Sequence, residues 1–364
     1  INLEAYTKTL FAALRDQTED IETLFTVIQA QDETVTTKEL LTLRYAILPR
    51  VKAAIAERAD LGQLLPHRAS LPGATNGLDS LRLRLGLQDP FSRVEQSTFN
   101  SVPDLGGRLW RRKLLNTGSY ALPNGDHSAP VEPTNLTSAH FDQHAGIITY
   151  FTVPSMGVSD EVAQSNIPDA RDIVSWMNVY EPQPFPGEIN QSLANEGATV
   201  YADACASCHG TLNSYGQLTR FPNWEGDIGT DPERANGLKA DVVDSVNASQ
   251  FGQYITARQV NGYTAPPLVG LWSSAPYLHN GSVPTLWHLM RPDQRPTEFE
   301  LGGHRLDLQK VGIDLAPPAD YQPWAIPEKI DTSQFGLSNS GHTIGFETLS
   351  ESEKDALLEF LKTL

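Results

Sequence analysis

The stretch Cys205-Ala206-Ser207-Cys208-His209 decides the fold and the chemistry that we expect of this chain. Two cysteines three positions apart, followed at once by a histidine, form the pattern by which a c-type haem is attached. Each thiol adds to a haem vinyl group, and the histidine binds the iron as its proximal ligand. One helical turn can present both sulfurs and the imidazole to the same porphyrin. The sequence therefore predicts one covalently bound haem c at Cys205, Cys208 and His209.

Other uses of a cysteine pair fit this chain less well. The chain contains only these two cysteines, and no second CxxC motif accompanies them to complete a zinc site. A thioredoxin-like CxxC begins a βαβ unit and needs no histidine after it, and no such unit is predicted here. A bare redox dithiol is the remaining alternative.

Length and composition indicate a globular protein with a sizeable core. The 364 residues are enough for two domains, or for one large domain and a smaller one. No run of 18 or more apolar residues is present, so we expect no transmembrane segment. The formal net charge of −17 argues against nucleic acid as a partner, because no basic excess is left to neutralise phosphates. The same charge would suit docking to a basic redox protein.

The haem motif also predicts the compartment, because haem c is attached outside the bacterial cytosol. We therefore expect a periplasmic or secreted protein. Ile1 is not an initiator methionine and no signal-peptide pattern follows it, so we expect a mature or trimmed product.

Apolar residues at helical spacing and the placement of proline and glycine predict two domains. Residues 2–30 and 36–59 are expected to form a helical hairpin, with Pro49 kinking its second helix. Residues 60–165 are rich in turn-forming residues and predict long ordered loops with short helices. A short helix over 169–180 precedes a proline-rich linker over 182–187. We place the boundary there, between a helical and loop-rich N-terminal domain, 1–188, and a cytochrome c domain, 189–364.

The second domain is expected to follow the plan of a class I cytochrome c. A helix over 189–206 runs into the haem motif, and Gly197 on its inner face would let another helix approach closely. The chain closes with a helix over 351–364, opened by a capping box of Ser350 and Glu353. The expected fold is mainly α, with a C-terminal class I cytochrome c-like domain that carries long loop insertions.

The second axial ligand decides whether a haem iron carries electrons or does chemistry. His279 lies in an apolar, proline-stiffened stretch over 266–282 that could cover a porphyrin, and we expect it to be the distal ligand of a bis-histidine iron. Met290 is the alternative ligand, and an open site is the third possibility. Three residues are candidate contacts to the haem propionates or the ring edge: Arg258, Trp272 and Tyr277.

The other histidines are expected to be structural. His140 and His144 are four positions apart, so a helix would place both on one face, where Asp142 could join them around a metal ion. Such pairs are more often surface residues or hydrogen-bonded ones. His288 is expected to face solvent. Four histidines stand alone and receive no role: His67, His127, His304 and His342.

Residues 275–286, Ala-Pro-Tyr-Leu-His-Asn-Gly-Ser-Val-Pro-Thr-Leu, resemble the bacterial di-haem cytochrome c peroxidase superfamily, and most of all its rubber-oxygenase branch. Three further stretches share this resemblance: residues 295–299 with 302–303, residues 338–342 and residues 349–354. It covers the chain from about residue 189 to the end. It is weaker over 1–188, where residues 73–79 are similar to a glycine-rich loop of the same branch.

The resemblance implies two haems, with oxygen or peroxide chemistry at one and electron relay at the haem of the C-terminal domain. It implies His279 as the distal ligand if this chain follows the rubber-oxygenase branch, and Met290 if it follows the peroxidases. This chain has one CxxCH motif, however. Either its N-terminus has been removed or it is a true mono-haem relative.

We therefore expect an extracytoplasmic c-type cytochrome that passes single electrons to a redox partner protein. One alternative is a haem peroxidase or oxygenase with an accessible iron, in which an acid–base residue such as His288 helps to split the O–O bond. Another is a fragment or subunit of a di-haem enzyme.

Overall fold

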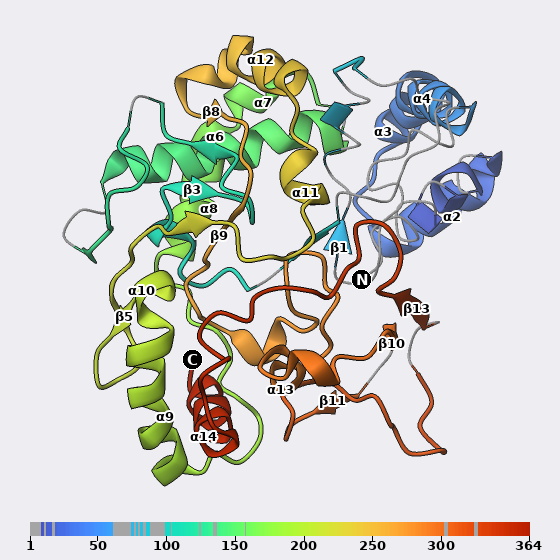
Figure 1. Cartoon of the computed structure of the whole chain (residues 1–364). Helices are drawn as coiled ribbons and strands as arrows, with labels where there is room; N and C mark the ends of the chain where they lie inside the picture. Colours follow the sequence, from blue (N-terminus) through green and yellow to red (C-terminus); the bar gives the residue numbers. More distant parts are fainter. Residues whose placement is uncertain are drawn as a thin grey trace.

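The structure, a computed structural model, describes residues 9–10, 12–16, 19–60, 74–75, 78, 81–82, 85–87, 99–102, 104–123, 125–133, 137–156, 158–301, 305–323 and 327–364. Helix predominates over strand, at 45% against 11%. Figure 1 shows helices joined by long irregular segments, with only short strands between them. The mainly helical prediction is confirmed.

The described N-terminal part is helical. It comprises α2 (Ile21–Gln31), α3 (Thr37–Thr42), a π-helical turn (Leu43–Ile47) and α4 (Leu48–Asp60). Arg44 in the π-helical turn ties this run to α2, because its guanidinium pairs with Glu22 and lies 4.9 Å from the centre of the Phe25 ring. Two helical segments linked by such contacts agree with the expected hairpin.

The expected single helix over 2–30 is interrupted. The Asp20 carboxylate accepts a hydrogen bond from the Thr23 N–H at 3.0 Å and thereby caps the start of α2. An aspartate in this role favours a helix start over a helix interior. In the second helical run the π-helical turn ends at Ile47, two residues before Pro49, which has no N–H to continue the regular pattern.

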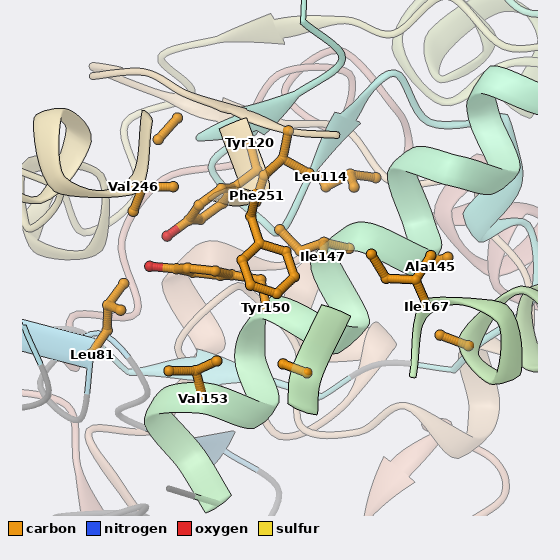
Figure 2. Close-up of a cluster of buried hydrophobic side chains, with 14 of the residues drawn as sticks. Leu81, Leu114, Tyr120, Ala145, Ile147, Tyr150, Val153, Ile167, Val246 and Phe251 are labelled. Carbon is orange, nitrogen blue, oxygen red and sulfur yellow. The ribbon is translucent and has the colours of Figure 1, made fainter. Parts of the chain in front are cut away.

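A first hydrophobic core is built on α6 (Ser138–Met156), which packs against α7 (Asp160–Ser165) and α8 (Ile167–Met177). Figure 2 shows its centre, where Tyr150 of α6 lies beside Tyr120 and Phe251, with ring centroids 6.4 and 5.4 Å away. Only loops and short helices were expected over 60–165, and for this segment that expectation is wrong. Because α6 is covered on most sides, its sequence lacks the apolar stripe of a surface helix.

The first core also takes in residues from beyond the predicted boundary. Strands β3 (Lys113–Leu114), β4 (Tyr120–Ala121) and β8 (Thr256–Ala257) form one antiparallel sheet, with Tyr120 opposite Ala257. Val242 and Val246 of α12 (Ala240–Ala248) and Phe251 belong to the same core. The hydrophobic cores are therefore not divided at residue 188, and the two-domain division stays a prediction.

A second core lies between α9 (Gln191–Ala204) and α14 (Glu351–Leu361), which run side by side in Figure 1. A β-carbon at Gly197 would lie 2.0 Å from the carbonyl oxygen of Ala356, so only glycine permits this approach. The capping box is present, since the Glu353 N–H donates to Ser350 Oγ and the Ser350 N–H donates to the Glu353 carboxylate. Both expectations for these helices are confirmed.

Short elements complete the fold. Three short α-helices of the described part are α10 (Ala206–His209), α11 (Glu233–Asn236) and α13 (Leu286–Leu289). Antiparallel pairs are formed by β1 (Ala74–Thr75) with β2 (Asn100–Ser101), β5 (Thr211–Leu212) with β6 (Leu218–Arg220), β7 (Glu225–Gly226) with β9 (Tyr263–Thr264), β10 (Glu298–Leu301) with β13 (Glu328–Asp331), and β11 (Leu306–Asp307) with β12 (Gly312–Ile313). Among the described residues, none of the helices combines the length and the apolar character needed to cross a bilayer.

Candidate functional site

The CxxCH motif lines a cavity at the end of α9. Cys205 caps α9, and α10 follows at once, so both thiols and the imidazole lie within about one helical turn. All three residues line a cavity of about 240 Å³, and neither cysteine forms a disulfide. Burial raises the pKa of the Cys205 thiol to about 11. A thiol that stays protonated at neutral pH disfavours the bare redox dithiol, because the thiolate is the reactive form.

His209 is oriented as a metal ligand. Its Nδ1 lies 2.8 Å from the carbonyl oxygen of Pro266 and donates to it, which leaves Nε2 free to bind a metal. Burial lowers the pKa of His209, so the ring is neutral near pH 7. Neutral imidazole is the form that binds metals. Together with the two thiols, His209 fits the covalent attachment and proximal ligation of a haem c.

His342, which received no role from the sequence, lies in the same cavity beside His209. The centroids of the two rings are 6.0 Å apart. Two imidazoles on opposite sides of one metal ion, each bonded at about 2 Å, would have ring centroids about 6 Å apart. Burial lowers the pKa of His342 to about 4, so this ring is also neutral. The pair therefore has the spacing of a bis-histidine site.

The backbone around His342 is held tightly in place. Gly341 has φ +78°, and a β-carbon there would lie 2.2 Å from the carbonyl carbon of Gly229. Arg295 donates from Nη1 to the Gly341 carbonyl at 2.9 Å and from Nη2 to the Leu289 carbonyl at 2.8 Å. These contacts fix the segment just before the closing helix α14.

Residues 275–286 contribute to the same support. Asn280 donates from Nδ2 to the carbonyl oxygens of Gly336 and Ser338, at 3.2 and 3.0 Å. Ser282 Oγ donates to the Ser338 carbonyl at 3.0 Å. The stretch that was expected to supply the distal ligand thus anchors the loop that carries His342.

His279 lines the cavity as well, but its Nε2 already has a partner. The ring is 9% exposed and stacks on Tyr263, with centroids 4.1 Å apart. Tyr263 Oη donates to the Asp231 carbonyl and accepts from His279 Nε2 at 3.1 Å. Burial, aided by the charge of Arg234, lowers the pKa of His279 to about 3. A metal bond at Nε2 would have to replace the hydrogen bond to Tyr263.

Comparison with protein families bears on this cavity directly. Residues 262–300, which include Tyr263 and His279, match the family model described as RoxA-like, cytochrome c-like. This part of the chain is therefore similar to a RoxA-like, cytochrome c-like domain. Such a domain implies binding of haem c, in agreement with the CxxCH motif. The match supports the expected resemblance to the rubber-oxygenase branch.

Two curated proteins of Sinorhizobium fredii (strain NBRC 101917 / NGR234) are similar to this chain. The uncharacterized protein y4iM is 34% identical over 173 residues, which cover 40% of this chain and 39% of that protein. The uncharacterized protein y4iJ is 32% identical over 361 residues, which cover 80% of this chain and 59% of that protein. The chain thus spans less than two thirds of the length of either relative.

The three predicted haem contacts differ in their position relative to the cavity. Tyr277 lines the cavity. Trp272 lies outside the cavity lining and donates from Nε1 to the Gln183 carbonyl at 2.8 Å. Arg258 also lies outside the lining, because its guanidinium pairs with Glu225.

Met290 and His288 are both buried away from the cavity lining. Met290 is 1% exposed in the second core. His288 was expected to face solvent, and this is wrong: it is 5% exposed, and its Nδ1 lies 2.7 Å from Thr285 Oγ1. Thr285, the residue before α13, is thus the hydrogen-bond partner of the imidazole. His67 and His304 lie outside the described residues.

His140 and His144 lie one turn apart on α6, as expected, but they do not form a metal site. Among the described residues, no group of three or more His, Cys, Asp or Glu side chains is arranged to hold a metal ion. His144 Nδ1 lies 2.8 Å from the His140 carbonyl oxygen, and its Nε2 lies 3.0 Å from that of Arg108. Arg108 lines the cavity, so the contact between His144 and the Arg108 carbonyl links α6 of the first core to the site.

We expect stability to fall in acid partly because of His144. Burial lowers its pKa from 6.5 to about 4. Its contribution is therefore complete above pH 6.5 and is lost as the pH falls towards 4, with a slope of at most about 1.4 kcal/mol per pH unit. Urea unfolding between pH 7 and pH 4 should show a shallower pH dependence in His144→Gln than in the parent. The control is His127→Gln, and equal slopes in all three proteins would contradict the prediction.

Proposed function

We propose that this chain is an extracytoplasmic c-type cytochrome that carries one covalent haem and passes single electrons. The observation that carries the proposal is the pairing of His209 with His342 at 6.0 Å, in a cavity also lined by two free thiols. A haem held there by Cys205, Cys208, His209 and His342 would supply one-electron exchange between ferric and ferrous states.

Several residues of the cavity have a defined part in this proposal. Cys205 and Cys208 would form the thioether bonds to the haem, and the Pro266 carbonyl holds His209 in the tautomer that presents Nε2. His342 would supply the second imidazole, because its ring has the required spacing from His209. We prefer it to His279, whose Nε2 is hydrogen-bonded to Tyr263. The leucines of the lining, among them Leu268, Leu286, Leu357 and Leu361, exclude water from the ring.

The proposed haem and the net charge support a compartment and a class of partner. Because haem c is attached outside the bacterial cytosol, the proposal includes a periplasmic or secreted location. At a formal net charge of −17, the surface would attract a basic redox protein, and this attraction would weaken as salt is added. A partner that binds more weakly at high ionic strength would fit the proposal.

The test is the haem content of the full chain, expressed together with a cytochrome c maturation system. We expect one haem per chain by pyridine haemochrome assay, resistant to extraction with acidified acetone. The double variant Cys205→Ala, Cys208→Ala should lose essentially all covalent haem, because no other cysteine is present. Ser207→Ala lies between the two cysteines and is the matched control. Absence of haem from the parent, or covalent haem retained by the double variant, would overturn the proposal.

A second candidate is a peroxidase or oxygenase, and one observation favours it. The hydrogen-bonded pair of His279 and Tyr263 lines the cavity and could handle a proton near a bound oxygen species. His288, named from the sequence for such a role, lies outside the cavity lining. Carbon monoxide distinguishes the candidates: a ferrous spectrum that does not respond supports electron transfer, and one that shifts supports the enzyme.

A further inference from the structure

Two arginines near the cavity, the half-buried Arg108 and the buried Arg111, have no carboxylate partner among the described residues. Arg108 lines the cavity and donates from Nε and Nη2 to the Asp104 carbonyl, at 3.1 and 2.8 Å. Arg111 is 2% exposed and donates from Nη2 to the Leu115 carbonyl and to Thr264 Oγ1. Among the described residues, neither guanidinium forms an ion pair.

The carboxylate nearest in sequence is engaged elsewhere. Asp104 Oδ1 accepts from the Gly106 N–H at 2.7 Å, and Oδ2 accepts from Tyr180 Oη at 3.0 Å. Several buried cations of this fold are neutralised by carboxylates: Lys113, for example, pairs with Glu225 at 2.9 Å. Arg108 and Arg111 differ from these, because no carboxylate of the described residues pairs with either.

The two guanidinium groups also repel each other. Burial, together with the charge of Arg108, lowers the pKa of Arg111 to about 9. Arg108 is buried enough for its own pKa to be lowered, with Asp104 opposing the shift. Holding the Arg111 cation out of water beside a second, half-buried cation is unfavourable unless an anion compensates them. The cavity is the place from which such an anion can reach Arg108.

We propose that Arg108 binds a propionate carboxylate of the haem, with Arg111 behind it as a second positive charge. The inference rests on the proposed haem function. A guanidinium and a carboxylate form charge-assisted, often bidentate hydrogen bonds, and these are strongest where water is excluded. Haem carries two such carboxylates on one edge. Asn116 and Thr230 also line the cavity and offer it neutral polar groups.

The experiment measures the reduction potential of the holoprotein against pH for the parent and for Arg108→Gln, Arg108→Lys and Arg305→Gln. Arg305 is the control for net charge, because its side chain is 48% exposed and lies outside the cavity lining. Removing a cation beside the haem favours the ferric state, so Arg108→Gln should lower the potential. It should also raise the propionate pKa, so that the potential becomes pH-dependent at higher pH than in the parent. Arg108→Lys should keep most of the parent behaviour.

The outcomes separate the two proposals. If neither the parent nor any variant carries haem c, the proposed function fails. If haem is bound but Arg108→Gln matches Arg305→Gln in potential and pH profile, the propionate contact is overturned. A third outcome is that added acetate shifts the reduction potential of the parent in a saturable way but leaves that of Arg108→Gln unchanged. This would show that Arg108 binds a separate small carboxylate, and it would also overturn the propionate contact. Circular dichroism of each variant excludes misfolding as the cause.

Discussion

The His342→Ala variant is expected to change from a low-spin to a high-spin ferric spectrum and to bind one carbon monoxide per ferrous haem. Alanine cannot fill the axial position opposite His209, so water or an added ligand would enter. Free imidazole should restore the low-spin spectrum, because the space left by the ring in the cavity suits it. Visible spectra of the ferric and ferrous protein, with and without carbon monoxide, provide the measurement.

His279→Ala is the matched control for this prediction, because both histidines line the same cavity. We expect it to remain low-spin and indifferent to carbon monoxide, although loss of the hydrogen bond to Tyr263 could shift the potential. The reverse result, a high-spin His279→Ala and a low-spin His342→Ala, would restore the ligand expected from residues 275–286. If only Met290→Ala became high-spin, both histidine assignments would fail.

Gly197→Ala is expected to destabilise the protein by about 1–3 kcal/mol or more, because the added β-carbon would overlap the Ala356 carbonyl and force α14 away from α9. Alanine is the better helix former by up to about 1 kcal/mol, but this gain does not offset a backbone clash. Urea unfolding followed by circular dichroism measures the change. The displaced α14 would also disturb Leu357 and Leu361, which line the cavity.

Thr199→Ala, an exposed position on the same helix, is the control and should alter stability by no more than about 0.5 kcal/mol. If Gly197→Ala and Thr199→Ala unfolded at the same urea concentration, the close contact of α9 with α14 would be refuted. A fall in stability confined to Gly197→Ala would identify this contact as the reason for glycine.

Those parts of the fold that follow from neighbouring residues could be predicted from the sequence. The capping box of Ser350 and Glu353 fixes the start of α14 within a few residues, and the helix ahead of the haem motif ends at Cys205. The interior helix α6 gave no such signal, because it is covered on most sides and has no polar face to set its period. The break at Asp20 was missed because the apolar spacing continues across it.

The proximal half of the site could be predicted because CxxCH is a local motif. The position of His342 beside His209 could not, because His342 reaches the cavity through contacts between distant segments. Arg295 and Asn280 hold its loop by hydrogen bonds to backbone carbonyls, and no spacing rule reports such bonds. The available signal was the position of Gly341 and His342, just ahead of the closing helix.

Residues 238–257 have a consequence for how the molecule unfolds. The chain leaves the first core after α8, forms the haem motif, returns to the first core through α12 and β8, and then leaves again for the second. Because these chain segments pass between the two cores, unfolding of one core would displace residues that belong to the other. The two cores should therefore melt in one cooperative transition, so that a haem bound at the second core would also stabilise residues of the first.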